Sequence, residues 1–130
     1  MTTELKVVCH ENCGNAPRKE ILRDLTIALV TKNIPYIQEW FSENIVWRLI
    51  GNRQFTEKEQ VLKHISSMST SVPLQLKIDN IITHGKVASI NGNVKFQEGK
   101  ILEFCDVYEF VSAGKNAKIK DILSYHIPVC

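Results

Sequence analysis

The sequence predicts an α+β fold, in which three helices from the N-terminal half pack on one face of a mostly antiparallel sheet. Two observations support this prediction. Apolar residues recur at helical spacing up to Met68, and they alternate with polar residues from Pro73 onward. Three turn signals then divide the second half into four strands, so the expected order is α-α-β-α-β-β-β-β.

Capping and turn signals place the three helices. The first is expected over Pro17–Thr31, because proline is tolerated in a first turn and Asn15 can cap the helix. The second is expected over Ile34–Phe41, again with a proline in its first turn. Thr56 and Glu59 have the spacing of a capping box for the third. The apolar sides of the helices consist of Ile21, Leu22, Leu25, Ala28 and Leu29, then Ile37, Trp40 and Phe41, then Val61, Leu62, Ile65 and Met68.

The strands are recognised by β-branched residues and by alternation. Asn44–Ile50 is short and apolar, and Gly51 with Asn52 ends it. The four later strands form an antiparallel meander joined by turns that contain glycine. We expect them over residues 73–84, 87–96, 101–112 and 117–127.

Length and composition limit the organisation and the partners of the chain. Its 130 residues, 44% of them hydrophobic, are enough for one core, so we expect a single domain over residues 1–130 with a loosely ordered N-terminal segment at 1–15. The net charge of +2 is spread without a basic stripe, and no apolar stretch approaches the ~18 residues of a membrane span. We therefore expect no nucleic-acid partner and no membrane partner.

The cysteines raise the question of disulfides and metal. The N-terminal residues contain no apolar signal core, so we expect a cytoplasmic protein whose four cysteines are free thiols. Cys9, His10 and Cys13 are possible metal ligands, but no second ligand pair follows at finger-like spacing. We expect no metal site and no cofactor.

The order of elements and three strands carry a resemblance to a known family. The strands are Ile45–Gly51, Phe104–Phe110 and Ile119–His126. With them the chain resembles the nuclear transport factor 2-like superfamily, specifically its SnoaL-like and ketosteroid-isomerase-like members, over about the whole length after Pro17. The resemblance implies a cone-shaped fold whose strongly curved sheet wraps the helices around an apolar pocket. Members include isomerases, dehydratases, hydrolases, cyclases and proteins without catalytic activity, so the fold leaves the chemistry open.

Asp106 is the most informative candidate residue. Strand side chains alternate between faces, so Asp106 shares its face with Phe104, Tyr108 and two further apolar residues. A carboxyl group there loses water, which favours the neutral acid unless a donor or cation stabilises the anion. The resemblance implies that Asp106 donates a hydrogen bond to a substrate oxyanion. The alternative is a buried structural residue paired with His126, Tyr125 or a helix residue.

Two other parts of the isomerase machinery have no match. The family position of the general base falls on Leu49, or on Arg48 if the alignment slips by one, and neither side chain accepts a proton. The first helix has no tyrosine to polarise a carbonyl. Ketosteroid isomerisation is therefore not expected.

Two hypotheses of different classes remain. In the first, the cone pocket binds a small, largely apolar organic molecule, with acid/base catalysis of an isomerase, dehydratase or hydrolase type centred on Asp106 and with His126 as a weaker candidate base. In the second, the protein is a non-catalytic dimerisation or protein-interaction module with a vestigial pocket. A cavity of several hundred cubic ångströms favours the first, since drug-sized sites hold roughly 300–1,000 Å³. The candidate ligand-binding residues are Trp40, Trp47, Leu49, Phe104 and Tyr108.

A homodimer is expected in either case. Related cones pair through the outer face of the sheet, and isologous pairs are the commonest oligomers. On that face this sequence has apolar residues at Ile101, Cys105, Val107 and Val111.

Overall fold

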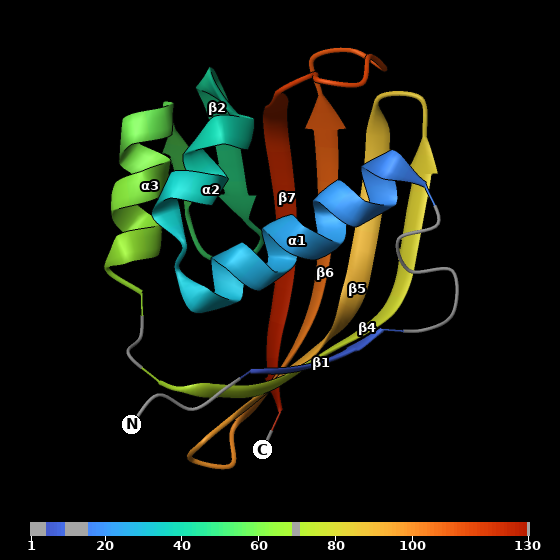
Figure 1. Cartoon of the computed structure of the whole chain (residues 1–130). Helices are drawn as coiled ribbons and strands as arrows, with labels where there is room; N and C mark the ends of the chain where they lie inside the picture. Colours follow the sequence, from blue (N-terminus) through green and yellow to red (C-terminus); the bar gives the residue numbers. More distant parts are fainter. Residues whose placement is uncertain (1–4, 10–15, 69–70, 130) are drawn as a thin grey trace.

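A computed structural model describes residues 5–9, 16–68 and 71–129 of the chain (Figure 1). In this part of the chain a seven-stranded sheet has the strand order β1-β4-β5-β6-β7-β2-β3. The elements are β1 (Lys6–Cys9), α1 (Pro17–Thr31), α2 (Ile34–Trp40), β2 (Phe41–Leu49), β3 (Gln54–Thr56), α3 (Lys58–Ser66), β4 (Pro73–His84), β5 (Val87–Phe96), β6 (Ile101–Phe110) and β7 (Ile119–Val129).

This architecture confirms the predicted fold class and the predicted order of its main elements. The sheet is mostly antiparallel, with parallel pairing only between β1 and β4 and between β2 and β7 among the described strands. Figure 1 shows α1 lying across the sheet from β4 to β7, with α2 and α3 in front of β2. The short strands β1 and β3, which the sequence analysis did not predict, lie at the two edges of the sheet.

The core forms between the helices and the concave face of the sheet. Leu22 and Leu25 of α1 have no exposed surface, and neither has Ile90 of β5 nor Tyr108 and Phe110 of β6. On β6, the residues that alternate with Tyr108 and Phe110 are only half-buried, so one face of the sheet is in the core and the other faces outward. The apolar stripe of α1 therefore covers the face that also carries Asp106.

Gly92 allows the sheet to bend where β4 meets β5. A Cβ atom at this position would overlap the backbone carbonyl of Lys77 on the neighbouring strand. The register between the two strands shifts close by, between Ile78 and Asn80, and Figure 1 shows β4 bending so that its first half runs along β1. A side chain here would force the strands apart, so the curvature depends on glycine.

Several predicted boundaries are corrected by the structure. Phe41 is buried and begins β2 instead of ending α2, because its backbone is extended and pairs with Ile119 of β7. The predicted capping box at Thr56 is absent, because Thr56 pairs with Val46 in β3. The N-cap of α3 is Glu57, whose side chain makes no capping bond.

The other boundary changes are small. The N-cap of α1 is Ala16 without a side-chain cap, and Asn15 lies outside the described residues. Strand β6 ends at Phe110 where the sequence predicted 112, and β7 covers Ile119–Val129 where it predicted 117–127. These differences follow from long-range pairing, which sequence patterns do not report.

The N-terminal segment differs from the expectation in two ways. The prediction of a loosely ordered segment is wrong for Lys6–Cys9, which pairs in parallel with β4, while residues 10–15 lie outside the described residues. The prediction of free thiols is wrong for Cys9, which is disulfide-bonded, whereas Cys105 is free.

The described residues also bear on the membrane and metal expectations. No helix there is long and apolar enough to cross a membrane. Within the same ranges, no three His, Cys, Asp or Glu side chains come together as a metal site, and His10 and Cys13 lie outside the described residues.

Candidate functional site

A cavity of about 130 Å³ lies between α1 and the concave face of the sheet. Most of its wall is apolar, because α1 and β5 to β7 each turn their core-facing side chains towards it. Its polar lining side chains include Asp106 and Tyr108 on β6 and Ser124 and His126 on β7, together with Thr26 on α1 and with Lys32 and Ser71 outside these elements. The lining residues include Leu29 and Val30 of α1, Val94 and Phe96 of β5, Leu102, Phe104, Asp106 and Tyr108 of β6, and Ile122, Ser124 and His126 of β7.

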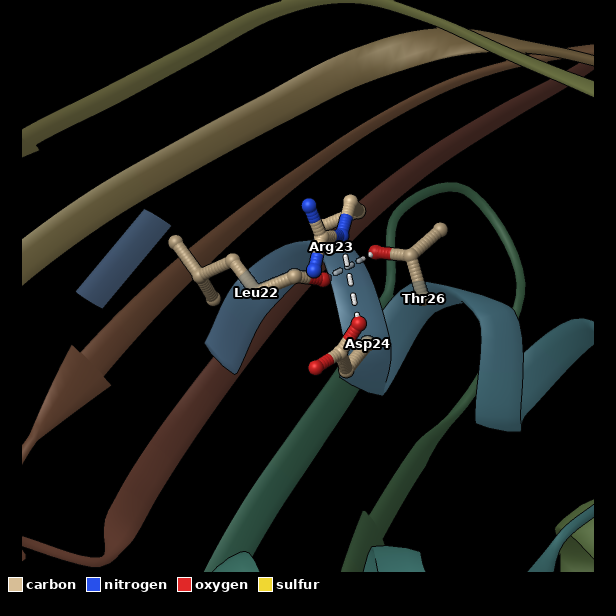
Figure 2. A network of polar contacts seen from close by, with 4 residues as sticks. All are labelled: Leu22, Arg23, Asp24 and Thr26. Atoms are coloured by element: carbon tan, nitrogen blue, oxygen red, sulfur yellow. Dashed lines mark hydrogen bonds and ion pairs between the residues drawn. The ribbon is translucent and has the colours of Figure 1, made fainter. Parts of the chain in front are cut away.

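The helix side of this cavity presents no free hydroxyl group. Thr26 of α1 lines the cavity, but its Oγ1 donates a hydrogen bond to the Leu22 carbonyl oxygen at 2.8 Å, one turn earlier in the helix (Figure 2). The nearby Arg23–Asp24 ion pair is partly exposed and does not line the cavity. A ligand therefore meets an apolar surface on α1 and polar groups on the sheet.

Asp106 and His126 form a polar pair in this apolar wall. Asp106 is 6% exposed, and its Oδ1 lies 3.1 Å from His126 Nε2. The pair forms because Asp106 is opposite Ser124 in the β6–β7 register, which places His126 diagonally across the strands on the same face. A carboxylate oxygen accepts hydrogen bonds, so in this contact Nε2 is the donor to Oδ1 and Nδ1 is the ring nitrogen left for a ligand.

Tyr108 contributes a buried hydroxyl group without a partner. Its side chain lines the same cavity, has no exposed surface, and its hydroxyl oxygen makes no hydrogen bond within the described structure. Burial, together with the charge of Asp106, raises the pKa of Tyr108 well above its usual value. The phenol therefore stays neutral and can donate a hydrogen bond to an acceptor in the cavity.

Ser124 and Trp47 connect the pair to β2. The Trp47 Nε1–H group donates to Ser124 Oγ at 2.7 Å, and both residues are buried. Ser124 lies between β2 and β6, so this bond ties the indole to the strand that carries His126. The Trp47 ring therefore has a fixed orientation in the cavity wall.

A second hollow of about 230 Å³ adjoins the first. Four residues line both spaces, namely Trp47, Met68, Ser124 and His126. Leu49, Ile50, Asn52 and His64 complete the second one. The first cavity alone is close to the roughly 150 Å³ that accepts one benzene ring, and the two together reach the lower end of the roughly 300–1,000 Å³ range of drug-sized sites.

The structure brings most of the predicted site residues together. Asp106, His126, Trp47, Phe104 and Tyr108 line the first cavity, and Leu49 lines the second hollow. Trp40 lies on α2 and packs against the core without lining either space. Sequence reasoning missed Ser124 and His64 as wall residues. The alternation of side chains along β7 places Ser124 on the same face as His126. Only the pairing of β7 with β2 brings Ser124 next to Trp47.

Comparisons with known proteins agree on the fold. No family model and no curated protein matches the chain. A solved NTF2-like protein of unknown function from Cytophaga hutchinsonii matches with a TM-score of 0.67 at 26% identity, over 83% of this chain and 97% of that one. A candidate ketosteroid isomerase from Kribbella flavida matches with a TM-score of 0.71 at 12% identity, over 85% and 78%. A candidate SnoaL-like polyketide cyclase from Shewanella denitrificans gives 0.68 at 10%, over 84% and 89%.

This chain has the NTF2-like fold. The predicted resemblance is confirmed, since the neighbours carry the names NTF2-like, SnoaL-like and ketosteroid isomerase. An NTF2-like fold houses unrelated chemistries, so it does not by itself define a reaction. In this NTF2-like fold α1 contains no tyrosine.

Proposed function

We propose that the protein binds a small, largely apolar organic molecule that carries an oxygen acceptor, and that the Asp106–His126 pair performs acid/base catalysis on it. The observation that carries the proposal is that three polar side chains, Asp106, His126 and Tyr108, lie together in a mostly apolar cavity wall. Buried polar groups are normally satisfied, so an unpartnered hydroxyl group beside a cavity points to a ligand.

The roles follow from the chemistry of each group. Tyr108 would donate a hydrogen bond to the ligand oxygen and so draw electron density from the neighbouring carbon atom. His126, held by Asp106 through Nε2, would accept a proton at Nδ1 and return it later. The apolar wall excludes water, which strengthens both interactions. Such a site supports proton transfer next to a carbonyl group, which isomerisations, dehydrations and cyclisations share.

The experiment uses 4-phenyl-2-butanone, which joins one aromatic ring to a ketone. Calorimetry should show binding to the parent protein and to Tyr125→Phe, the matched control, because Tyr125 is 43% exposed on the outer face. Binding to Tyr108→Phe should be weaker by about fivefold or more, as expected for one lost hydrogen bond. In D2O, the parent should exchange the protons next to the ketone faster than buffer does, and Asp106→Asn and His126→Gln should not.

Two outcomes of these experiments would contradict the proposed function. If folded protein neither binds the ketone nor contains a co-purified organic molecule by mass spectrometry, the binding function is wrong. If binding occurs without faster exchange in the parent, the catalytic half is wrong.

A specific observation also favours an assembly role. The outer face of the sheet exposes apolar residues on β4 and β7, with Ile82 at 63%, Ile127 at 61% and Tyr125 at 43% exposure, and Tyr125 is paired with Cys105 of β6. Large exposed apolar residues gathered on one face of a sheet are typical of an interaction surface. We propose a two-fold homodimer through this face.

Light scattering at micromolar concentration tests the assembly. The parent should have the mass of a dimer, Ile127→Glu should shift towards a monomer, and Val72→Glu, in an exposed loop before β4, should not. A monomeric parent would contradict the proposal. A dimer that binds neither ketone nor co-purified ligand would instead support the non-catalytic module.

A further inference from the structure

We propose that the second hollow, next to α3, is a subsite for a carboxylate group, and that His64 is the residue that binds it. The ligand would be an arylalkanoic acid with its ring in the first cavity and its carboxylate in the second hollow. This inference rests on the proposed function, because both spaces would hold one molecule.

The hollow exists because two neighbouring strands end at different positions. Strand β2 pairs with β7 only up to Leu49 opposite Ser124, whereas β7 continues to Val129. Beyond Leu49 the chain turns away, with the Ile50 amide donating to the Ser124 carbonyl oxygen at 3.0 Å. The space beside the last part of β7 is bounded by that turn, by α3 and by His126. It therefore continues the first cavity past the Asp106–His126 pair.

The wall of the second hollow suits an anion. Its polar side chains are Asn52, His64, Ser124 and His126, and none of the lining residues is acidic. Asp106 lines the first cavity and is turned to His126. Arg53, next to Asn52, is near enough to His64 for its charge to act on that ring. A carboxylate would meet hydrogen-bond donors and a positive potential here, with no opposing carboxylate in the wall.

His64 is held rigidly and has unused hydrogen-bonding capacity. Its ring stacks on Phe55 with 4.1 Å between centroids and lies edge-on to Trp47 at 5.5 Å. Neither ring nitrogen has a hydrogen-bond partner in the described part of the chain. Burial, and secondly the charge of Arg53, lowers the pKa of His64, so the ring is neutral at pH 7 and carries one N–H donor. A ring fixed in this way loses little entropy when it binds a ligand.

The two spaces together define the size of the ligand. The first cavity of about 130 Å³ fits one aromatic ring. A short alkyl chain would pass His126, which lines both spaces, and place the carboxylate beside His64. Phenyl-substituted propanoic acid has this shape, and it differs from 4-phenyl-2-butanone only at its polar end.

Calorimetry with 3-phenylpropanoate and with 4-phenyl-2-butanone tests the subsite. The parent should bind the acid more tightly than the ketone. His64→Phe keeps the stack on Phe55 but removes the ring nitrogens, and it should weaken acid binding about tenfold or more while leaving ketone binding within about twofold. His84→Phe, an exposed histidine on β4, is the matched control and should change neither. Arg53→Gln should weaken acid binding less, since Arg53 is exposed and screened.

The outcomes separate this inference from the proposed function. If the ketone binds and the acid does not, or if His64→Phe weakens both ligands equally, the carboxylate subsite is wrong and the proposed function stands. If neither ligand binds to folded parent protein, both proposals are wrong. Thermal melting of His64→Phe with ligand absent identifies a loss of binding that comes from unfolding.

Discussion

Replacing Tyr108 with phenylalanine should stabilise the protein and weaken its binding of a carbonyl compound. The Tyr108 side chain is completely buried and its hydroxyl group has no hydrogen-bond partner. A buried unsatisfied polar group costs about 1–3 kcal/mol, and the substitution removes it without changing the shape of the ring. Opposite effects on stability and on binding are the signature of a group kept for function.

The size of the effect can be worked out from the length of the chain. An unfolding entropy of about 2.1 cal/mol/K per residue over 130 residues means that 1 kcal/mol shifts Tm by about 4 °C. Tyr108→Phe should therefore raise Tm by about 4–10 °C in a calorimetric scan of ligand-free protein. Tyr125→Phe should shift Tm by less than about 2 °C, because Tyr125 lies outside the core and the substitution keeps its aromatic ring on the outer face.

An unchanged or lower Tm for Tyr108→Phe would refute the reasoning. It would show that the hydroxyl group has a partner in solution, such as a water molecule bridging it to Asp106. The inference of a ligand acceptor would then lose its main support.

Three further predictions concern other parts of the molecule. Asp106→Asn should lower the free energy of unfolding by only about 1 kcal/mol, because the amide oxygen still accepts a hydrogen bond from His126 Nε2. A loss above about 3 kcal/mol in urea titrations would show that the pair serves the stability of the fold instead of a ligand. Gly92→Ala should destabilise by about 1–3 kcal/mol or more through overlap with the Lys77 carbonyl, and a parental Tm would contradict the close approach. The pKa of His64 in the folded protein is below its unfolded value of 6.5, so between these two pKa values the unfolded chain binds more protons than the folded one. The parent should therefore lose stability relative to His64→Phe as the pH falls through 6.5 towards the folded pKa. A difference in Tm between the two proteins that stays constant with pH would contradict this prediction.

Local patterns in the sequence were sufficient to predict the fold class and the position of Asp106. The alternation along residues 101–110 puts Asp106, Phe104 and Tyr108 on one face whatever the strand pairs with, because side chains alternate in any strand. Likewise, the proline in the first turn and the helical spacing of leucines predicted α1 with its observed bounds. These features depend on neighbours a few residues apart, which the sequence displays directly.

The rest of the site depends on which strands pair and in which register. His126 meets Asp106 because β7 pairs antiparallel with β6, and Ser124 meets Trp47 because β7 also pairs in parallel with β2. The pairing of β1 with β4 likewise joins segments about 70 residues apart. The second hollow forms because β2 ends at Leu49 while β7 continues to Val129, and only the pairing of these two strands places the two ends relative to each other. Contacts between distant segments are selected by the burial of the whole core, so the sequence alone determined which face carries Asp106, whereas only the tertiary structure decided its partners.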